Sequence, residues 1–409
     1  MIAALYAGAA GLADPGLRLW LARRARRGKE IAARLPERRG IDATARPPGT
    51  LLWLHAASVG ETVSVLPVLD ALATIAPAAT LLMTTGTVTS AEILARRMPT
   101  VLHRFAPLDV PRWAARFLDH WRPDAAAFVE SEIWPNLLAA CQARGLATML
   151  VNARLSPRSF ARWRRAPGLA RTLFGSFAEV QAQSVADAAR LAGLGARLGG
   201  PLGNLKFAAP PLPAPAAELA ALRAAFAGRP VWLAASTHPG EEEIARAVHD
   251  RIVARHPRLL TVIVPRHPAR GAAIAAPRRS RGAPPPEDAG LYVADTLGEL
   301  GLFYAAIETV FVGGSLVAHG GQNVLEPARL GCAVAIGPHA ENFAEPVAAL
   351  TAAGGLARVA DAEALAGFVD RMLADPAARH AMAAAARAAA SRDADLPLLV
   401  ARRLAGMLG

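Results

Sequence analysis

The sequence predicts an α/β protein built from two doubly wound, Rossmann-like domains, with the active site in the cleft between them. Three observations support this fold class. The chain has 409 residues, which is more than one ordinary hydrophobic core accommodates. Short apolar runs alternate with helical stretches, which is typical of a parallel sheet covered on both faces. A proline-dense stretch, AAPPLPAPA at residues 208–216, divides this pattern into two halves.

Six strands are expected in the first half of the chain, and helical segments separate most of them. The first helix is expected over residues 61–75, and the next one ends near Arg97. The strands are predicted at residues 51–55, 80–84, 101–105, 125–129, 148–151 and 179–183. Such repeated βα units indicate one parallel sheet.

The same alternation resumes after the proline-dense stretch. Strands are predicted at residues 231–235, 259–264, 291–294, 309–312 and 333–336. An Arg- and Pro-rich exposed loop (277–287) and a helical tail (361–409) complete this half. We therefore expect an N-terminal membrane-associating segment (1–29), a first domain (30–207), a linker (208–216) and a second domain that includes the tail (217–409).

The N-terminus has the composition of an interfacial membrane anchor. Residues 1–13 are apolar and uncharged, and Asp14 and Pro15 interrupt the run. A spanning helix needs roughly 20 unbroken apolar residues, and a signal peptide carries its positive charge before the apolar run. Here the basic residues come afterwards: Arg18, Arg23, Arg24, Arg26, Arg27 and Lys29. The alternative is a core helix with a solvated basic end.

Charge and cysteine content limit the partners and the compartment. The formal net charge of +12 favours an anionic partner such as nucleic acid, anionic lipid or a phosphorylated substrate. Cys141 and Cys332 are far apart in the chain, and their spacing indicates neither a disulfide framework nor a zinc site. We expect both to be buried apolar residues in a reducing compartment.

Polar motifs follow the predicted strands, beginning with HAASVGE at residues 55–61. Ser58 and Gly60 form a tight turn, and Glu61 begins the next helix. The helix dipole should keep this carboxylate ionised, as a general base requires. A simple capping role for Ser58 and Glu61 explains the pattern equally well.

Further polar residues follow the later strands of the first half. Glu130 and Glu132 come directly after the strand at 125–129, before a proline-initiated helix. Asn152 and Arg154 follow the next strand. Lys206 precedes the linker, where it is either a surface lysine or part of the cleft floor.

The strand ends of the second half are suited to an anionic ligand. The motif STHPGEE (236–242) opens a helix, whose free N–H groups bind anions. Arg266, after Pro265, can clamp a phosphate or carboxylate. The motif DTLGE (295–299) follows a third strand.

The densest group of polar and glycine residues is GGS at 313–315 followed by HGGQNVLEP at 319–327. Paired glycines allow close approach of the backbone to a ligand. Asn323 and Glu326 are one helical turn apart and share a face, where a carboxylate can accept hydrogen bonds from both hydroxyls of a ribose. A glycine-rich turn before a capped helix is the alternative.

Several common motifs are missing from the sequence. It contains no P-loop, no GxGxxG that opens a helix and no HExxH. The one Asp-x-Asp pair, Asp393 and Asp395, lies in the helical tail rather than after a strand. A metal-dependent sugar-nucleotide site of the Asp-x-Asp kind is therefore not expected.

Taken in order, these motifs resemble the transferases of 3-deoxy-D-manno-octulosonic acid (Kdo) in lipopolysaccharide synthesis. The resemblance runs from about residue 50 to 345 through LHAASVGE, VESEIWPNL, NARLS, GNLKF, STHPGEEE, VPRHP, DTLGEL and FVGGSLVAHGGQNVLEPA. It implies a GT-B fold with an acceptor-binding first domain and a donor-binding second domain. It also implies CMP-Kdo as donor, a bisphosphorylated lipid A precursor as acceptor, and inversion of the anomeric centre without a metal cofactor. Nucleic acid is not an expected partner, and the expected location is the cytoplasmic face of the inner membrane.

The resemblance also assigns roles to residues. Glu61 corresponds to the general base, and Glu130 and Lys206 to residues that support the transition state. The segments expected to hold CMP contain Pro265, Arg266, Leu297, Gly298, Glu299, Gly314, Ser315, Asn323, Val324, Leu325 and Glu326. The acceptor side is expected to contain Ser58, Gly60, Glu132, Asn152 and Arg154.

Two other classes of protein are alternatives. One is a GT-B enzyme that uses a UDP-sugar, either a glycosyltransferase or an epimerase, and the ordered motif set argues against it. The other is a non-catalytic basic protein that binds membranes or nucleic acid. Such proteins interleave Lys and Arg with exposed aromatic residues, whereas aromatic residues are only 5% of this chain.

Overall fold

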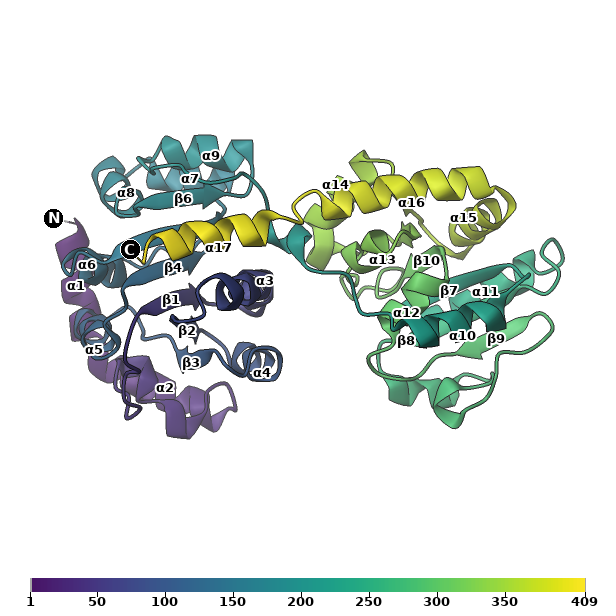
Figure 1. The fold of residues 1–409 in the computed structure, drawn as a ribbon, viewed down its shortest axis with the longest axis horizontal. Coiled ribbons are helices and arrows are strands. Elements are labelled where there is room, and N and C mark those ends of the chain that lie inside the picture. Colours follow the sequence, from purple (N-terminus) through teal and green to yellow (C-terminus); the bar gives the residue numbers. More distant parts are fainter. Residues whose placement is uncertain (1, 409) are drawn as a thin grey trace. The chain divides into compact units, whose positions relative to one another are not determined.

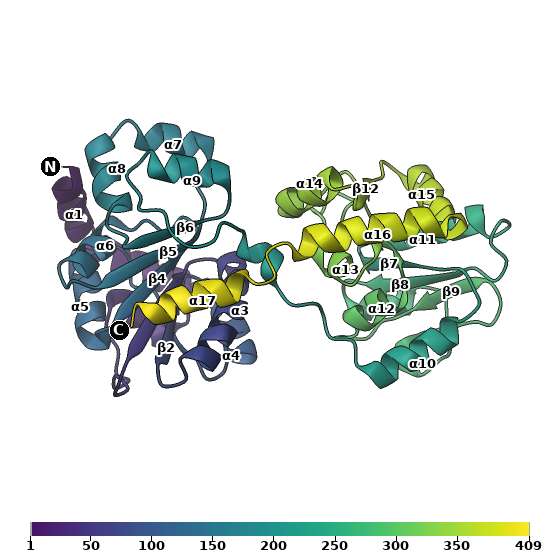
Figure 2. The ribbon, with the colours of Figure 1, turned by 45° about the horizontal axis from the view of Figure 1, so that its top comes forward.

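The structure is a computed structural model that describes residues 2–408, and the chain divides into two compact units. Unit 1 comprises Met1–Ala209 together with Asp393–Gly409, and unit 2 comprises Pro210–Arg392. Each unit contains one six-stranded sheet with helices on both faces (Figures 1 and 2). The predicted α/β class with two doubly wound sheets is confirmed.

The sheet of unit 1 has the strand order β3-β2-β1-β4-β5-β6, and all neighbours are parallel. The six predicted strands are all present, each within one or two residues at its ends. They are β1 (Leu51–Ala56), β2 (Thr80–Thr85), β3 (Leu102–Phe105), β4 (Ala125–Val129), β5 (Ala147–Ala153) and β6 (Glu179–Ala182).

Two apolar layers cover this sheet, because successive side chains of a strand point to opposite faces. Trp53 packs with α5, α6, α8 and α9, whereas its neighbour Leu54 packs with α3, α4 and α17. The helices of unit 1 are α1 (Ile2–Leu12), α2 (Asp14–Arg26), α3 (Val59–Ile75), α4 (Val88–Arg97), α5 (Pro111–Trp121), α6 (Pro135–Gln142), α7 (Pro157–Trp163), α8 (Pro167–Phe174), α9 (Val185–Ala192) and α17 (Leu396–Gly406), with 3₁₀ turns η1 (Ala32–Arg34), η2 (Glu37–Arg39) and η3 (Leu205–Ala208).

The last helix, α17, belongs to unit 1 and packs along α3 (Figures 1 and 2). The predicted assignment of residues 217–409 to the second domain is therefore wrong for this helix. Its apolar stripe, which includes Leu396, Val400 and Leu404, is buried in the core of unit 1. An amphipathic pattern shows that one face of a helix is buried, but it does not identify the sheet that covers it.

The sheet of unit 2 has the strand order β12-β11-β10-β7-β8-β9, again parallel throughout. Five strands agree with the prediction, and the edge strand β12 was not predicted because it has only three residues. The strands are β7 (Val231–Thr237), β8 (Leu260–Pro265), β9 (Gly290–Val293), β10 (Thr309–Val312), β11 (Ala333–Ile336) and β12 (Leu356–Arg358).

The helices of unit 2 include two members of the predicted helical tail. Before the first of these helices, residues 209–215 form neither helix nor strand. The helices are α10 (Ala216–Phe226), α11 (Glu241–Ile252), α12 (Leu300–Ala306), α13 (Leu325–Arg329), α14 (Ala344–Ala352), α15 (Ala362–Ala374) and α16 (Pro376–Ser391), with 3₁₀ turns η4 (Pro268–Ala273), η5 (Arg279–Arg281) and η6 (Glu341–Phe343). The loop at 277–287 has no buried residue, as predicted.

Both sheets share one topology, and it identifies the loops where a ligand binds. In each sheet the chain winds outward in one direction and then in the other, and the direction changes between β1 and β4 in unit 1 and between β7 and β10 in unit 2. In such sheets the ligand crevice lies beyond the carboxyl ends of the two strands at this point.

The N-terminal segment forms two short helices that pack on unit 1. Asp14 is buried between them and pairs with Arg18 and Arg112. Burial alone would raise the pKa of Asp14, but hydrogen bonds from Arg112 and Arg18 lower it below its usual value. None of the helices described for residues 2–408 has both the length and the apolar character needed to cross a membrane.

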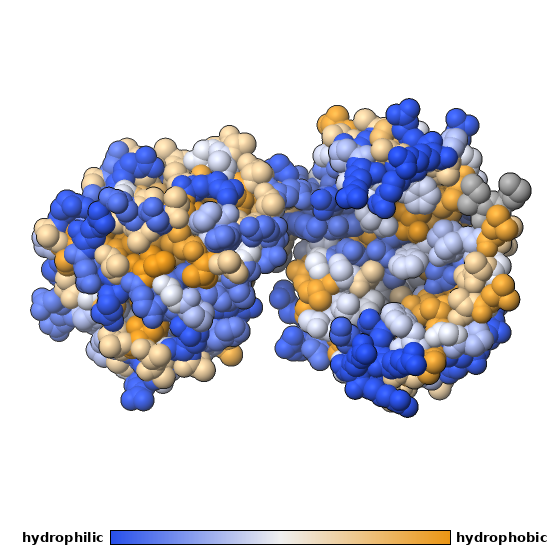
Figure 3. Space-filling model, turned by 180° about the vertical axis from the view of Figure 1, so that it is seen from behind, coloured by the Kyte–Doolittle hydropathy of each residue, from blue (hydrophilic) through white to orange (hydrophobic). Residues whose placement is uncertain are grey.

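Part of this segment is exposed and apolar. Leu12 is 86% exposed, and Leu5, Tyr6, Leu19 and Trp20 also face outward. Figure 3 shows apolar surface along one margin of unit 1. Leu21, by contrast, is buried against Val110 and Trp113, so the segment has one apolar side in the core and another in solvent.

Candidate active site

The turn after β1 presents Glu61 at the edge of the sheet of unit 1. Ser58 is the N-cap of α3, and it forms a reciprocal capping box with Glu61. The backbone N–H groups of Ala57 and Ser58 donate to Glu61 Oε2 at 2.7 and 3.4 Å. Among residues 2–408, no donor contacts Oε1 of this carboxylate. Gly60 is exposed in the first turn of the helix, with open space around it.

The environment of Glu61 differs from the one predicted. Burial raises the pKa of Glu61 above its usual value, and the charges of Glu132 and Glu130 raise it further against the hydrogen bonds from Ala57 and Ser58. The prediction considered only the helix dipole, which favours the ionised form, and left out burial and the two neighbouring carboxylates, which oppose it. A raised pKa brings a carboxylate closer to the working pH, which suits a general base.

Glu130, at the end of β4, is paired with Lys206. Its Oε1 lies 2.7 Å from Lys206 Nζ. Glu130 has a left-handed backbone with φ of +57°, which costs energy in a residue other than glycine. Its N–H donates to the carbonyl of Val151 on β5 at 2.9 Å, so the strained residue remains tied to the sheet. The structure thus brings together the two residues that the resemblance associates with the transition state.

Asn152 is buried and holds the turn that carries Lys206. It is fully buried, also with a left-handed backbone. Its Oδ1 accepts the N–H of Leu205 at 3.0 Å, and its own N–H donates to Gln181 Oε1 at 2.7 Å. The predicted acceptor-side position of Asn152 is thus replaced by a role in holding η3, which carries Lys206. Gln181 was not predicted.

Glu132 ends a buried chain of polar side chains. Its carboxylate contacts Trp134 Nε1 at 2.5 Å and His55 Nε2 at 3.3 Å. Thr84 Oγ1 contacts His55 Nδ1 at 3.0 Å and accepts Trp53 Nε1 at 2.9 Å. Burial alone would raise the pKa of Glu132, but the hydrogen bonds from His55 and Trp134 bring it below its usual value. Glu132 is therefore the carboxylate with fixed charge beside Glu61.

Two cavities open beside these carboxylates within unit 1. One, of about 400 Å³, is lined by Glu130, Arg154, Ser156, Trp163 and neighbouring apolar residues, and the side chain of Arg154 is exposed. The other, of about 260 Å³, has walls from the N-terminal segment and from the turn after β1. Its lining includes Trp20, Arg24, Arg38, His55, Ala57 and Trp134.

In unit 2, four of the residues predicted to bind the donor line one cavity of about 300 Å³: Arg266, Gly298, Asn323 and Glu326. Asn323 Nδ2 donates to Glu326 Oε1 at 3.0 Å, so the two side chains lie together, although Asn323 precedes α13 and is not on a helix face. Burial raises the pKa of Glu326, and the hydrogen bond from Asn323 and the charges of Arg329 and Arg266 offset this only in part. One cation, Arg266, and the acceptor atoms of Asn323 and Glu326 thus line the same pocket.

We predicted that the backbone amides of the glycine-rich loop after β10 are open to a ligand, but Gly314, Ser315 and Leu316 already donate theirs within the chain. Glu241, buried at 1% exposure, accepts the N–H groups of Gly314, Ser315 and Leu316 at 2.6–2.9 Å, and that of His238 at 2.9 Å. The anion held here is therefore a carboxylate of the chain itself. The sequence prediction gave these amides to the donor because paired glycines allow close approach of a backbone to a ligand, and the sequence has no local signal for the contact with the distant Glu241.

The other residues predicted to bind the donor differ in their exposure to solvent. Val324 and Leu325 have buried side chains, and Pro265 is buried at the end of β8. Leu297 is 80% exposed. Glu299 forms a two-pronged ion pair with Arg279, whose hydrogen bond lowers the pKa of Glu299.

The structure also locates the predicted cysteines and the Asp-x-Asp pair. Cys141 and Cys332 are buried and free, as predicted. Asp393 Oδ2 accepts the N–H of Asn204 at 2.9 Å, beside the turn that carries Lys206. Among residues 2–408, no group of three or more His, Cys, Asp or Glu side chains is arranged to hold a metal ion.

Comparisons with known proteins agree with this geometry. A family model described as 3-deoxy-D-manno-octulosonic-acid transferase matches residues 33–209. A probable mitochondrial 3-deoxy-D-manno-octulosonic acid transferase of Arabidopsis thaliana is 35% identical over 89% of this chain and 86% of its own. The transferase of the same name from Bordetella pertussis is 36% identical over 92% of each chain.

The crystal structure of MurG from Acinetobacter baumannii has a similar fold, with a TM-score of 0.52 and 13% identity over 85% of this chain and 99% of that one. Two parallel doubly wound sheets, as found here, make up the GT-B fold. Within that fold class, the chain belongs to the family of 3-deoxy-D-manno-octulosonic acid transferases.

Proposed function

We propose that this protein transfers Kdo from CMP-Kdo to the primary hydroxyl of a lipid A precursor, lipid IVA, with inversion at the anomeric carbon. The observation that supports the proposal most directly is the state of Glu61. Its carboxylate is fixed through Oε2, has Oε1 without a donor among residues 2–408, and has a raised pKa. Membership of the Kdo transferase family supplies the donor and acceptor classes.

In the proposed reaction, Glu61 accepts the proton of the acceptor hydroxyl. The hydroxyl oxygen forms a bond to the anomeric carbon of Kdo, and the bond from that carbon to the phosphate oxygen breaks, so that CMP leaves. Lys206, held at 2.7 Å from Glu130, supplies positive charge where negative charge develops. Glu132 keeps its charge and thereby favours the protonated form of Glu61 after transfer.

On the donor side, we assign the phosphate of CMP to Arg266 and the ribose to Glu326 and Asn323. The guanidinium of Arg266 is exposed at the mouth of the pocket, and its backbone N–H is fixed by the carbonyl of Thr237 at 3.0 Å. A guanidinium binds two phosphate oxygens at once, and a carboxylate accepts from two vicinal hydroxyls. The pocket has the groups that a nucleoside monophosphate requires.

We further propose that transfer needs no metal and that the enzyme works at the cytoplasmic face of the inner membrane. CMP is already a good leaving group, so a base, a phosphate clamp and charge stabilisation suffice. The exposed apolar side chains of α1 and α2, followed by the basic residues from Arg23 to Lys29, match an interfacial anchor.

The experiment that tests the function uses purified full-length protein, CMP-Kdo and tetraacylated lipid A precursor. Mass spectrometry should show the acceptor heavier by one or more Kdo units, with excess EDTA making no difference. A parallel reaction with UDP-sugars should show no transfer and no epimerised donor. Turnover of a UDP-sugar with no consumption of CMP-Kdo would overturn the proposal, and loss of activity in EDTA that magnesium restores would overturn its metal-free form.

A further inference from the structure

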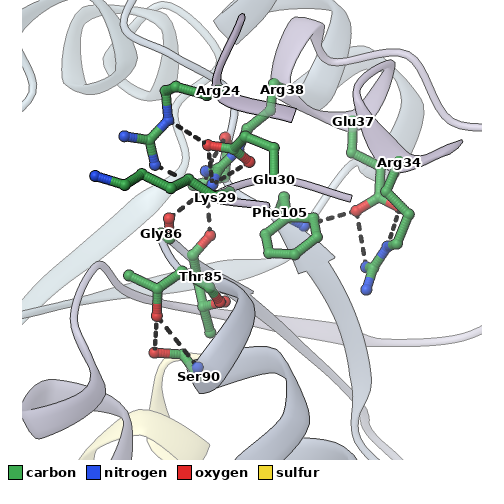
Figure 4. A network of polar contacts seen from close by, with 12 residues as sticks. Arg24, Lys29, Glu30, Arg34, Glu37, Arg38, Thr85, Gly86, Ser90 and Phe105 are labelled. Atoms are coloured by element: carbon green, nitrogen blue, oxygen red, sulfur yellow. Dashed lines mark hydrogen bonds and ion pairs between the residues drawn. The ribbon is translucent and has the colours of Figure 1, made fainter. Parts of the chain in front are cut away.

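Arg38 lies at the centre of a buried polar network that joins the N-terminal segment to the sheet of unit 1 (Figure 4). It is only 4% exposed, although it carries a charge. Its Nη1 donates to the carbonyl of Ala106 at 3.2 Å and to that of Thr85 at 3.4 Å, and its Nη2 donates to the carbonyl of Gly86 at 2.6 Å. One side chain thus binds the carboxyl ends of both β2 and β3.

Glu30 holds this guanidinium in its orientation. It is 6% exposed and contacts Arg38 through Nε and Nη2, both at 3.0 Å, while Arg24 Nε donates to its other oxygen at 2.9 Å. The guanidinium of Arg38 also lies 4.7 Å from the centre of the Phe105 ring. A buried charge with this many partners has one available geometry.

Two backbone hydrogen bonds connect the turn that Arg38 binds to Glu61. The N–H of Gly86 donates to the carbonyl of Ala57 at 3.1 Å, and the N–H of Ala57 donates to Glu61 Oε2 at 2.7 Å. The peptide unit between Thr85 and Gly86 is therefore bound at both ends, by Arg38 at its carbonyl and by Ala57 at its N–H. Hydrogen bonds in such a chain polarise and strengthen one another.

The backbones of Gly86 and Ala57 are in close contact. A Cβ atom on Gly86 would lie 2.3 Å from the carbonyl oxygen of Ala57, so the two backbones touch. A shift of the turn at Gly86 would therefore move Ala57, and with it the N–H that fixes Glu61. The same residues line the 260 Å³ cavity, where Arg24, Glu30 and Arg38 face Ala57.

We propose that Arg38 is a positioning residue for Glu61, acting through Gly86 and Ala57, and that Glu30 keeps Arg38 in place for this task. The inference rests on the proposed role of Glu61 as the base. It adds that the segment between α2 and β1 is part of the catalytic apparatus, because η2 carries the cation that sets the turn after β1.

Arg46 provides a matched control in the same unit. It also precedes β1 and donates to backbone carbonyls, those of Trp121 at 2.7 Å and Arg122 at 3.2 Å, and it pairs with Asp124. These groups lie at the amino ends of the strands, because Asp124 immediately precedes β4. Loss of Arg46 removes similar interactions at the edge opposite to Glu61.

The experiment compares full-length Arg38→Met, Arg38→Lys and Arg46→Met with the unmodified protein. For each, the measurements are the unfolding midpoint, kcat, KM for CMP-Kdo and the pH dependence of kcat. We expect both Met variants to be less stable. Only Arg38→Met should lose kcat, by roughly 10- to 100-fold, the range expected when a catalytic group is displaced slightly.

Three further results are expected. KM for CMP-Kdo should change less than twofold in Arg38→Met, because the proposed donor pocket lies in unit 2. The acid limb of its pH profile should move to higher pH, because a weaker bond from Ala57 leaves Glu61 facing Glu130 and Glu132 with less compensation. Arg38→Lys, which keeps the charge but reaches fewer carbonyls, should recover part of the loss. If Arg38→Met does not fold, Arg38→Lys is compared with Arg46→Lys by the same measurements.

A double variant separates this inference from the proposed function. In a Glu61→Gln background, Arg38→Met should lower kcat by no more than about twofold, since its effect passes through Glu61. Equal losses of kcat in the Arg38 and Arg46 variants, or full additivity with Glu61→Gln, would overturn the positioning role alone. Normal activity of Glu61→Gln itself would instead overturn the assignment of the base.

Discussion

The two units place a glutamate at the same point of the same topology and use it in opposite ways. Glu61 lies in the first turn of α3, the helix after β1, and Glu241 lies in the first turn of α11, the helix after β7. Glu61 accepts two N–H groups on one oxygen, whereas Glu241 accepts four from two loops and is buried. A carboxylate at this position is available for chemistry only where the fold leaves one of its oxygens without a donor.

Replacement of the open carboxylate should have the largest effect on activity. Glu61→Gln keeps the shape and the acceptor for Ala57 but removes the proton acceptor. We expect kcat for Kdo transfer to fall by about 10² to 10⁴, as loss of a general base typically does. The unfolding midpoint should hardly change. If kcat of Glu61→Gln stays within a few-fold of that of the unmodified protein, the open carboxylate of Glu61 is not the catalytic base.

Replacement of the closed carboxylate should act on stability instead. Glu241→Ala leaves four buried N–H groups without their acceptor, and we expect it to lower the free energy of unfolding of unit 2 by about 3 kcal/mol or more. Chemical unfolding followed by tryptophan fluorescence measures this. Glu243→Ala, an exposed position in the same helical turn, should change stability by less than about 0.5 kcal/mol. Equal effects of the two variants would contradict the structural role of Glu241.

The affinity of unit 2 for CMP should depend on Arg266 rather than on the glycine-rich loop. Arg266→Ala should weaken CMP binding by roughly 2 kcal/mol, about 30-fold in Kd, because a charge-assisted contact is lost. Calorimetry with CMP measures the change, and Arg281→Ala, an exposed arginine of the same unit, is the control. Unchanged CMP affinity of Arg266→Ala would falsify this assignment.

A smaller effect concerns the exposed apolar side chains of α1 and α2, which we propose to bind the membrane surface. Deletion of residues 1–29 would remove the buried residues Asp14 and Leu21, so surface variants are the better test. Leu5→Ser with Leu12→Ser and Leu19→Ser should weaken binding to anionic vesicles at least tenfold, since each immersed leucine contributes on the order of 1 kcal/mol. Val185→Ser, also exposed in unit 1, should not. Cosedimentation of the triple variant at the level of the unmodified protein would place the anchor elsewhere.

Local signals were enough to predict much of this molecule. The strand at Ala125–Val129 was predicted residue for residue, because the buried apolar run ends sharply at Glu130. The strand-end loops contained the candidate site because parallel topology brings them to one edge. The role of Asn152, the four bonds of Glu241 and the position of α17 depend on contacts between distant segments, for which a single sequence has no local signal.

The return of α17 to unit 1 has a consequence for the order in which the protein folds. The chain leaves unit 1 after Ala209, builds all of unit 2, and comes back at Asp393. During synthesis, every strand of unit 1 emerges from the ribosome before unit 2 begins, yet the helix that covers Leu54 and Val68 emerges last. Unit 2 can fold while unit 1 still exposes the apolar face that α17 later covers. Loss of α17 would therefore uncover the core of the first half of the chain rather than that of the second.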